Sequence, residues 1–195
     1  MDRYNGVTFE GQKSDYDGRL VVTDIIRYGI EQSLVYRAGY VDLAVPAEGD
    51  ITILIDPTEL PKVATKGKIS TETTQDVKIE YFEGVTVSDN GDPIVVYNFN
   101  RINPVASPSK IYSSPTVTDT GTKYSPDLYA FIGVGGVGSQ VSTITPGASS
   151  DEFSPYIDPD KKYLYRITNL STADAAKIAV DIRFVSEPKY PLGAV

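Results

Sequence analysis

The chain has 195 residues, with 18 Lys or Arg and 26 Asp or Glu, so its formal net charge is −8. Its 41% hydrophobic residues supply enough apolar area for the core of one domain, which excludes global disorder. The chain has no Cys, His or Trp, which excludes disulfide frameworks, Cys/His zinc sites, thiol nucleophiles and histidine-based acid–base catalysis.

The first 18 residues are predicted to form an N-terminal arm. Three glycines and several charged residues interrupt this stretch, and strand-like alternation is confined to residues 7–9. Residues 19–195 are predicted to form a single domain, because no linker and no internal repeat of fixed period divides them.

The rest of the chain is predicted to be built from β-strands. The whole chain contains 20 Val, 17 Ile and 17 Thr against 9 Leu and 12 Ala, which is a strand-forming composition. Apolar residues alternate with polar ones at a period of two, which is typical of half-buried antiparallel strands. The clearest alternating segments are residues 51–55, 77–81, 163–167 and 178–184.

Turn-forming residues separate these segments. The stretch Asp89–Asp92 contains Asn-Gly between two apolar runs, which predicts a β-hairpin. Strands spaced 8 to 20 residues apart, with Gly, Pro and Asx between them, predict an all-β fold, an antiparallel β-sandwich that is jelly-roll-like. A capping box at Ser171–Asp174 offers one helical turn as an alternative, but the alternation that starts at Ile178 favours a strand.

The segment Gly133–Gly138 matches the dinucleotide-binding pattern G-x-G-x-x-G. That site needs a helix directly after the glycines, and the following residues are β-branched and then broken by Pro146 and Gly147. We therefore interpret the segment as a loop between strands and expect no cofactor.

Acidic residues offer two further candidate sites. Glu80 with Glu83, or Asp151 with Glu152, could flank a glycosidic bond, but a paired acid on the polar face of a strand is the more ordinary state. The turn at Asp89–Asp92 lacks the regular oxygen ligands of a calcium loop, so no metal site is expected there.

The surplus of tyrosine is a candidate interaction feature. The chain has 14 Tyr, and tyrosine is favoured both at protein interfaces and in sandwich cores. We predict an interface with a partner protein or another subunit, formed by Tyr4, Phe9, Tyr16, Arg27, Tyr28, Tyr36, Arg37 and Tyr40.

Five segments, taken in chain order, resemble the auxiliary capsid proteins of tailed bacteriophages, also called decoration or head-stabilising proteins. The likeness spans about residues 20 to 185, and its strongest parts are YFEG, YSSPTV and DPDKKYLYRITNLS. The segments are 51–57 (ITILIDP), 78–84 (KIEYFEG), 98–103 (NFNRIN), 111–117 (IYSSPTV) and 154–171 (SPYIDPDKKYLYRITNLS).

The resemblance implies a β-sandwich that binds the major capsid protein on the outside of the virion and stabilises the shell, as a homo-oligomer on the capsid lattice. Such a protein is made in the host cytoplasm and is not an enzyme. An acidic chain is not expected to bind nucleic acid, and no apolar run approaches the length of a membrane span, so no membrane partner is expected.

One alternative is a carbohydrate-binding or host-attachment β-sandwich module, on a head fibre or a tail, that stacks exposed tyrosines on sugar rings. The other is a glycoside hydrolase or lyase that uses carboxylates and tyrosine.

Overall fold

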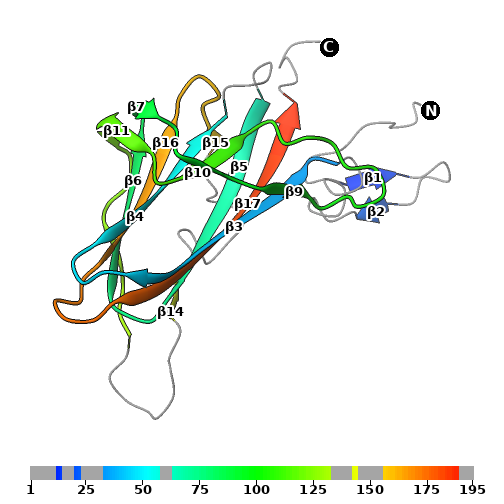
Figure 1. Cartoon of the computed structure of the whole chain (residues 1–195). Coiled ribbons are helices and arrows are strands. Elements are labelled where there is room, and N and C mark those ends of the chain that lie inside the picture. Colours follow the sequence, from blue (N-terminus) through cyan, green and yellow to red (C-terminus); the bar gives the residue numbers. More distant parts are fainter. Residues whose placement is uncertain are drawn as a thin grey trace.

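Figure 1 shows the computed structural model of the chain. The structure describes residues 12–14, 20–22, 33–57, 63–132, 142–144 and 156–188. All regular elements of this described part are β-strands, and the strand pairs within its sheets are antiparallel. The predicted β-sandwich is confirmed.

The first large sheet, sheet I, has the strand order β14-β5-β17-β3-β9, and β15 also pairs with β5. The long β17 lies at its centre between β3 and β5, so the C-terminal part of the chain is paired on both sides. Its strands are β3 (Val35–Val45), β5 (Val63–Thr73), β9 (Val96–Asn98), β14 (Ser142–Ile144), β15 (Tyr156–Ile157) and β17 (Ala176–Pro188).

The second large sheet, sheet II, has the order β12-β6-β16-β4-β10-β8, and β13 also pairs with β6. Its centre is β16, paired along its length with β4 and β6. Its strands are β4 (Asp50–Asp56), β6 (Val77–Glu83), β8 (Asp92–Ile94), β10 (Lys110–Ser113), β12 (Thr122–Lys123), β13 (Leu128–Ala130) and β16 (Tyr163–Asn169).

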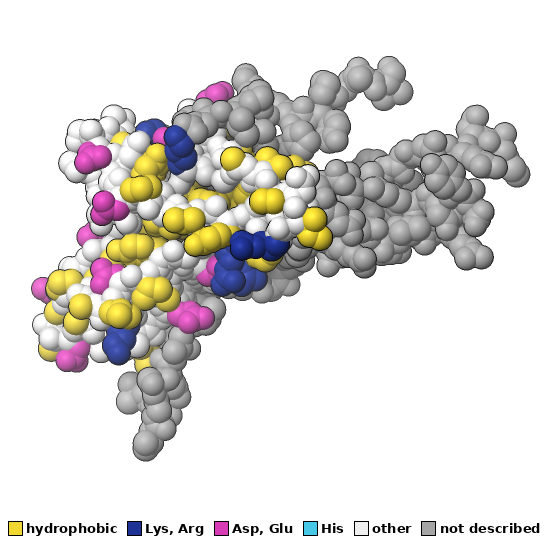
Figure 2. Space-filling model, turned by 45° about the vertical axis from the view of Figure 1, so that its right-hand side comes forward, with side chains coloured by type: hydrophobic (Ala, Val, Ile, Leu, Met, Phe, Trp, Pro, Cys, Tyr) yellow, Lys and Arg dark blue, Asp and Glu magenta, His cyan; other side chains and the backbone are white. Residues whose placement is uncertain are grey.

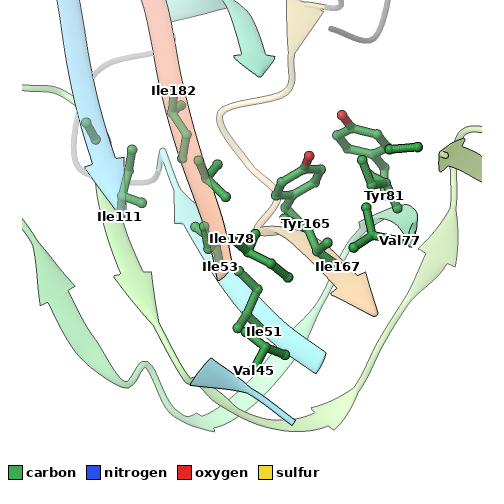
Figure 3. Packing of buried hydrophobic residues seen from close by; sticks show 14 of the residues in the cluster. Val45, Ile51, Ile53, Val77, Tyr81, Ile111, Tyr165, Ile167, Ile178 and Ile182 are labelled. Atoms are coloured by element: carbon green, nitrogen blue, oxygen red, sulfur yellow. The ribbon is translucent and has the colours of Figure 1, made fainter. Parts of the chain in front are cut away.

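The main core fills the space between the two sheets (Figure 3). The period-two alternation explains it, since every second side chain of a strand points to the same face. A hydrogen bond between the hydroxyls of Thr71 on sheet I and Tyr165 on sheet II also links the layers. The buried residues of the core are Tyr36, Ala38, Val45, Ile51, Ile53, Val77, Ile79, Tyr81, Ile111, Ala130, Tyr165, Ile167, Ala176, Ile178, Val180, Ile182 and Phe184.

A smaller core lies on the opposite face of sheet II. Leu54, Phe82 and Leu164 stand side by side on three neighbouring strands and pack with Val85. A two-stranded ribbon of β7 (Thr86–Asp89) and β11 (Thr116–Asp119) contributes its central valines to this cluster. Sheet II is therefore covered by apolar contacts on both faces in this region.

The β7–β11 ribbon has a pseudo-twofold arrangement. Its strands have the sequences TVSD and TVTD and start thirty residues apart. In each case a glycine follows the final aspartate after one intervening residue. The Ser88 hydroxyl donates to the carbonyl of Thr116, and the Thr118 hydroxyl donates to the carbonyl of Thr86.

The glycines that follow the two strands have equivalent roles. Gly91 and Gly121 both have positive φ, at 86° and 68°, and the preceding aspartates accept their N–H groups. A Cβ at Gly91 would lie 2.1 Å from the carbonyl oxygen of Ser113, and one at Gly121 would lie 2.2 Å from that of Glu83. Only glycine fits at either turn.

The hairpin predicted at Asp89–Asp92 is wrong, and the strand favoured over a helical turn after Ser171–Asp174 is confirmed. The turn at Asp89–Asp92 exists, but the hairpin is wrong, because β7 pairs with β11 while β8 pairs with β10. Ser171 does accept the N–H groups of Ala173 and Asp174, as a helix cap would, but the chain enters β17 at Ala176 and forms no helix.

The predicted boundary of the arm at residue 18 falls between two strands that pair with each other, β1 (Gln12–Ser14) and β2 (Leu20–Val22). The predictions made for the segments 133–138 and 151–152 lie outside the described residues.

Candidate interaction surface

The predicted interface residues are placed in different environments. Arg37 is exposed on the outer face of sheet I and pairs with Asp181 at 2.6 Å, and Tyr40 is half-buried. The prediction is wrong for Tyr36, which is 2% exposed and stacks on Phe184 with ring centroids 5.3 Å apart. The remaining predicted residues lie outside the described part and are Tyr4, Phe9, Tyr16, Arg27 and Tyr28.

Exposed apolar side chains gather instead around β9, from the residue just before the strand to the loop that follows it. We call this set the β9 loop surface. Figure 2 shows hydrophobic side chains spread over this face of the molecule, beside a group of Lys and Arg side chains. Ile102 is 98% exposed. The members of the surface are Val95, Tyr97, Phe99, Ile102 and Val105.

The loop behind this surface is held by the buried side chain of Asn98. Its amide nitrogen donates to the carbonyls of Ser33 at 2.8 Å and Val105 at 3.1 Å. Its amide oxygen accepts the N–H of Asn100 at 2.7 Å. One side chain thus ties both ends of the loop to the start of sheet I.

Asn100 continues this network toward the tip. Its amide oxygen accepts the N–H groups of Ile102 and Asn103, at 3.1 and 3.0 Å, and its amide nitrogen donates to the Ser33 hydroxyl at 2.9 Å. The same hydroxyl donates to the carbonyl of Asn103 at 2.7 Å. The loop therefore presents Ile102 from a fixed backbone.

Tyr36 supports the loop from the core side. Its hydroxyl donates to the carbonyl of Ala106 at 3.3 Å, and burial raises its pKa above the usual value. A hollow lined by residues that include Tyr97, Arg101 and Val105 lies beside the loop. The surface is thus apolar, with one guanidinium at its margin.

The sequence contained a signal for this loop. Asparagines at positions 98, 100 and 103 alternate with Phe99 and Ile102, although such a loop is expected to be polar. Sequence reasoning singles out this segment only through the family resemblance. Its function in positioning could not be deduced, because the partners of Asn98 lie at residue 33 and residue 105.

The candidate carboxylate pair is not brought together. The carboxylate of Glu80 forms ion pairs with Lys123 at 2.8 Å and with Lys78 at 3.2 Å. Burial by itself would raise the pKa of Glu80, but these two lysines lower it below the usual value. Glu83 pairs with Lys161 at 3.2 Å. Three positions apart on one strand, the two carboxylates point to opposite faces.

The turn at Asp89–Asp92 has its polar groups engaged within the protein. The carboxylate of Asp89 accepts the N–H of Gly91 at 3.1 Å, and the amide oxygen of Asn90 accepts from Lys162 at 3.0 Å. In the described residues, no group of three acidic side chains is arranged to hold a metal ion.

A second exposed aromatic feature lies on β13, at the edge of sheet II. Tyr129 and Phe131 are 47% and 66% exposed, and their rings are parallel within 4° at a centroid distance of 5.8 Å. The pair is the described feature closest to an aromatic stacking platform.

No family model, curated protein or solved structure matches the chain. Within the described part of the chain, no helix has the length and apolar character needed to cross a membrane.

Proposed function

We propose that the chain is a structural protein of a tailed-phage virion, which binds the major capsid protein on the outer surface of the shell and stabilises it. The proposal rests on the resemblance of five ordered segments to auxiliary capsid proteins and on the β9 loop surface. The segment NFNRIN belongs to both.

The observation that carries the proposal is the fully exposed side chain of Ile102 on a hydrogen-bonded loop backbone. An apolar side chain on a loop costs little entropy to immobilise when hydrogen bonds already order the backbone. Burial of one such side chain in a partner contributes about 1.5–3 kcal/mol. Repetition over a lattice of identical capsid subunits makes a modest contact sufficient for stable decoration.

Co-sedimentation with mature capsids tests the proposal. Binding is expected at micromolar concentration, and Ile102→Lys is expected to weaken it about 10- to 100-fold. Leu170→Lys is the matched control, because Leu170 is another exposed apolar residue and lies in the β16–β17 connection, away from β9 (Figure 1). No binding by the wild-type chain, or equal loss in both variants, would refute the proposal.

The stacked pair on β13 supports a second candidate, a carbohydrate-binding module. Parallel exposed rings of Tyr129 and Phe131 suit the apolar face of a sugar ring. Saturable binding on a glycan array, lost in Tyr129→Ala and kept in Ile102→Lys, would favour this function over capsid binding. The two surfaces therefore give opposite mutational patterns.

A further inference from the structure

The side chains of Asp56, Asn90 and Lys162 meet at one end of sheet II. The Lys162 ammonium donates to the amide oxygen of Asn90 at 3.0 Å and pairs with the carboxylate of Asp56, also at 3.0 Å. One amine therefore lies between a carboxamide and a carboxylate. The proposed capsid contact makes no use of this group.

The backbone at each of the three positions is held by the sheet. Asp56 is the last residue of β4, and Lys162 directly precedes β16, the strand that pairs with β4. The carbonyl of Lys162 accepts two N–H groups from the residues that follow β6, at 2.9 and 3.3 Å. Asn90 lies in the turn before Gly91, where only glycine fits. The three side chains are thus brought together by fixed main-chain positions.

The site lies beside the smaller core. Asp56 is two positions after Leu54 on β4, so its side chain points to the face of sheet II that carries this core. Lys162 is two positions before Leu164, and Asn90 directly follows β7 of the covering ribbon. Asp56 is 8% exposed, so few water molecules compete with the lysine for its carboxylate.

We propose that Lys162 and Asn90 form an intramolecular isopeptide bond, with Asp56 as the group that transfers protons. The Lys162 amine attacks the carboxamide carbon of Asn90. A new C–N bond forms, the original C–N bond of the carboxamide breaks, and its nitrogen leaves. Lysine amines act as nucleophiles once they have lost their proton, and a carboxylate in contact with the ammonium can accept it.

The protons balance without any further reactant. Asp56 accepts the first proton from the Lys162 ammonium. Of the two protons still on the attacking nitrogen, one stays on the new amide and the other passes to the departing nitrogen. That nitrogen also takes the proton held by Asp56 and leaves as ammonium, which restores the carboxylate. No oxidant, reductant or cofactor takes part.

The distances suit this attack. A nitrogen 3.0 Å from the amide oxygen of Asn90 lies within about 4 Å of the carbon that carries this oxygen. Reacting atoms need to approach to about 3–3.5 Å. The terminal torsion of asparagine has a broad range, so a rotation of this side chain closes the remaining gap while both backbones stay in place.

The bond joins the connection between β7 and β8 to the start of β16. It ties the β7–β11 ribbon covalently to sheet II and restricts the unfolded chain, as a disulfide does. The chain has no cysteine, so this amide cross-link supplies a covalent constraint that disulfides cannot supply here.

Intact-mass spectrometry of the purified full chain tests the proposal. The expected mass is lower than that of the sequence by one molecule of ammonia, and digestion should release the segments around Asn90 and Lys162 as one cross-linked peptide. Lys162→Arg keeps the positive charge beside Asp56 but has no nucleophilic amine, so it is expected to fold and to keep the full mass. Lys161→Arg is the matched control and should keep the bond, because Lys161 pairs with Glu83 instead.

The Asn-Gly sequence offers a competing reaction with the same change in mass. Asn90 can lose ammonia by cyclising onto the backbone nitrogen of Gly91, which no side chain shields. This loss would persist in Lys162→Arg and would give no cross-linked peptide. Equal loss of ammonia in the wild type and Lys162→Arg, or a wild-type chain of full mass, would overturn the proposal.

Asp56→Asn tests the proton transfer separately. An amide cannot accept the ammonium proton, so bond formation is expected to be at least tenfold slower, and the freshly purified variant should keep the full mass. Complete cross-linking in this variant would overturn the assignment of Asp56, while the two lysine variants test the bond itself. The bond forms within one chain, so its presence or absence is measured independently of capsid binding.

Discussion

Replacing Asn98 with alanine tests whether the β9 loop surface is ordered by one buried side chain. Asn98 is 7% exposed and makes two hydrogen bonds as donor and one as acceptor, at 2.8, 3.1 and 2.7 Å. At a net value of about 1 kcal/mol for each bond, Asn98→Ala should lower the free energy of unfolding by about 2–4 kcal/mol. Urea denaturation monitored by circular dichroism measures this loss.

Hydrogen exchange provides the local readout for the same variant. The N–H groups of Ile102 and Asn103 both donate to Asn100, whose own N–H is bound by Asn98. Faster exchange of these amides is therefore expected in Asn98→Ala. Asn103→Ala is the control within the loop, and because its side chain is exposed it should change stability by less than about 0.5 kcal/mol. A similarly small change in Asn98→Ala, with unaltered exchange, would refute the reasoning.

Four further outcomes are expected. Leu164→Ala should cost about 2–5 kcal/mol, because Leu164 is 1% exposed in the smaller core, and a loss below 1 kcal/mol by urea denaturation would contradict the ribbon's covering role. Gly121→Ala should lower the thermal midpoint in calorimetry, since its φ is positive and its Cβ would collide with a carbonyl. The pKa of Glu80 is lowered in the folded protein, so its carboxylate contributes fully to the free energy of unfolding above about pH 4.3. This contribution is lost as the pH falls through the pKa of the folded state. Glu80→Gln should therefore flatten this part of the acid denaturation curve, and an unchanged curve would contradict this role of Glu80. Burial raises the pKa of Tyr165 to about 12 and also raises that of Tyr81. These tyrosines ionise more readily in the unfolded chain, so the free energy of unfolding should fall as the pH rises above about 10. If the absorbance of tyrosinate shows that all tyrosines ionise before the protein unfolds, this account is contradicted.

The strands of the sandwich could be predicted from local pattern alone. The alternation at 178–184 and 77–81 gives the buried face of β17 and β6 correctly, because burial between two sheets selects every second side chain. The pairing of strands could not be predicted in the same way. β7 and β8 flank a good hairpin turn, yet β7 pairs with β11 and β8 pairs with β10.

The candidate surface was the less predictable part. Tyr36 and Arg37 are neighbours in the sequence, and the strand directs one into the core and the other to solvent. The exposure of Ile102 depends on hydrogen bonds between residues 98 and 100 and a serine at residue 33, which lies more than sixty positions away. Such long-range contacts leave no periodic signal in the chain.

The composition of purified virus particles tests the proposed function most directly. Quantitative mass spectrometry of virus particles purified from the source of the chain measures its number of copies relative to the major capsid protein. Decoration of the shell predicts one copy, or a simple fraction of a copy, for each capsid subunit. A few copies per particle would indicate a vertex, fibre or tail position, and complete absence from the particle would contradict a structural role in the virion.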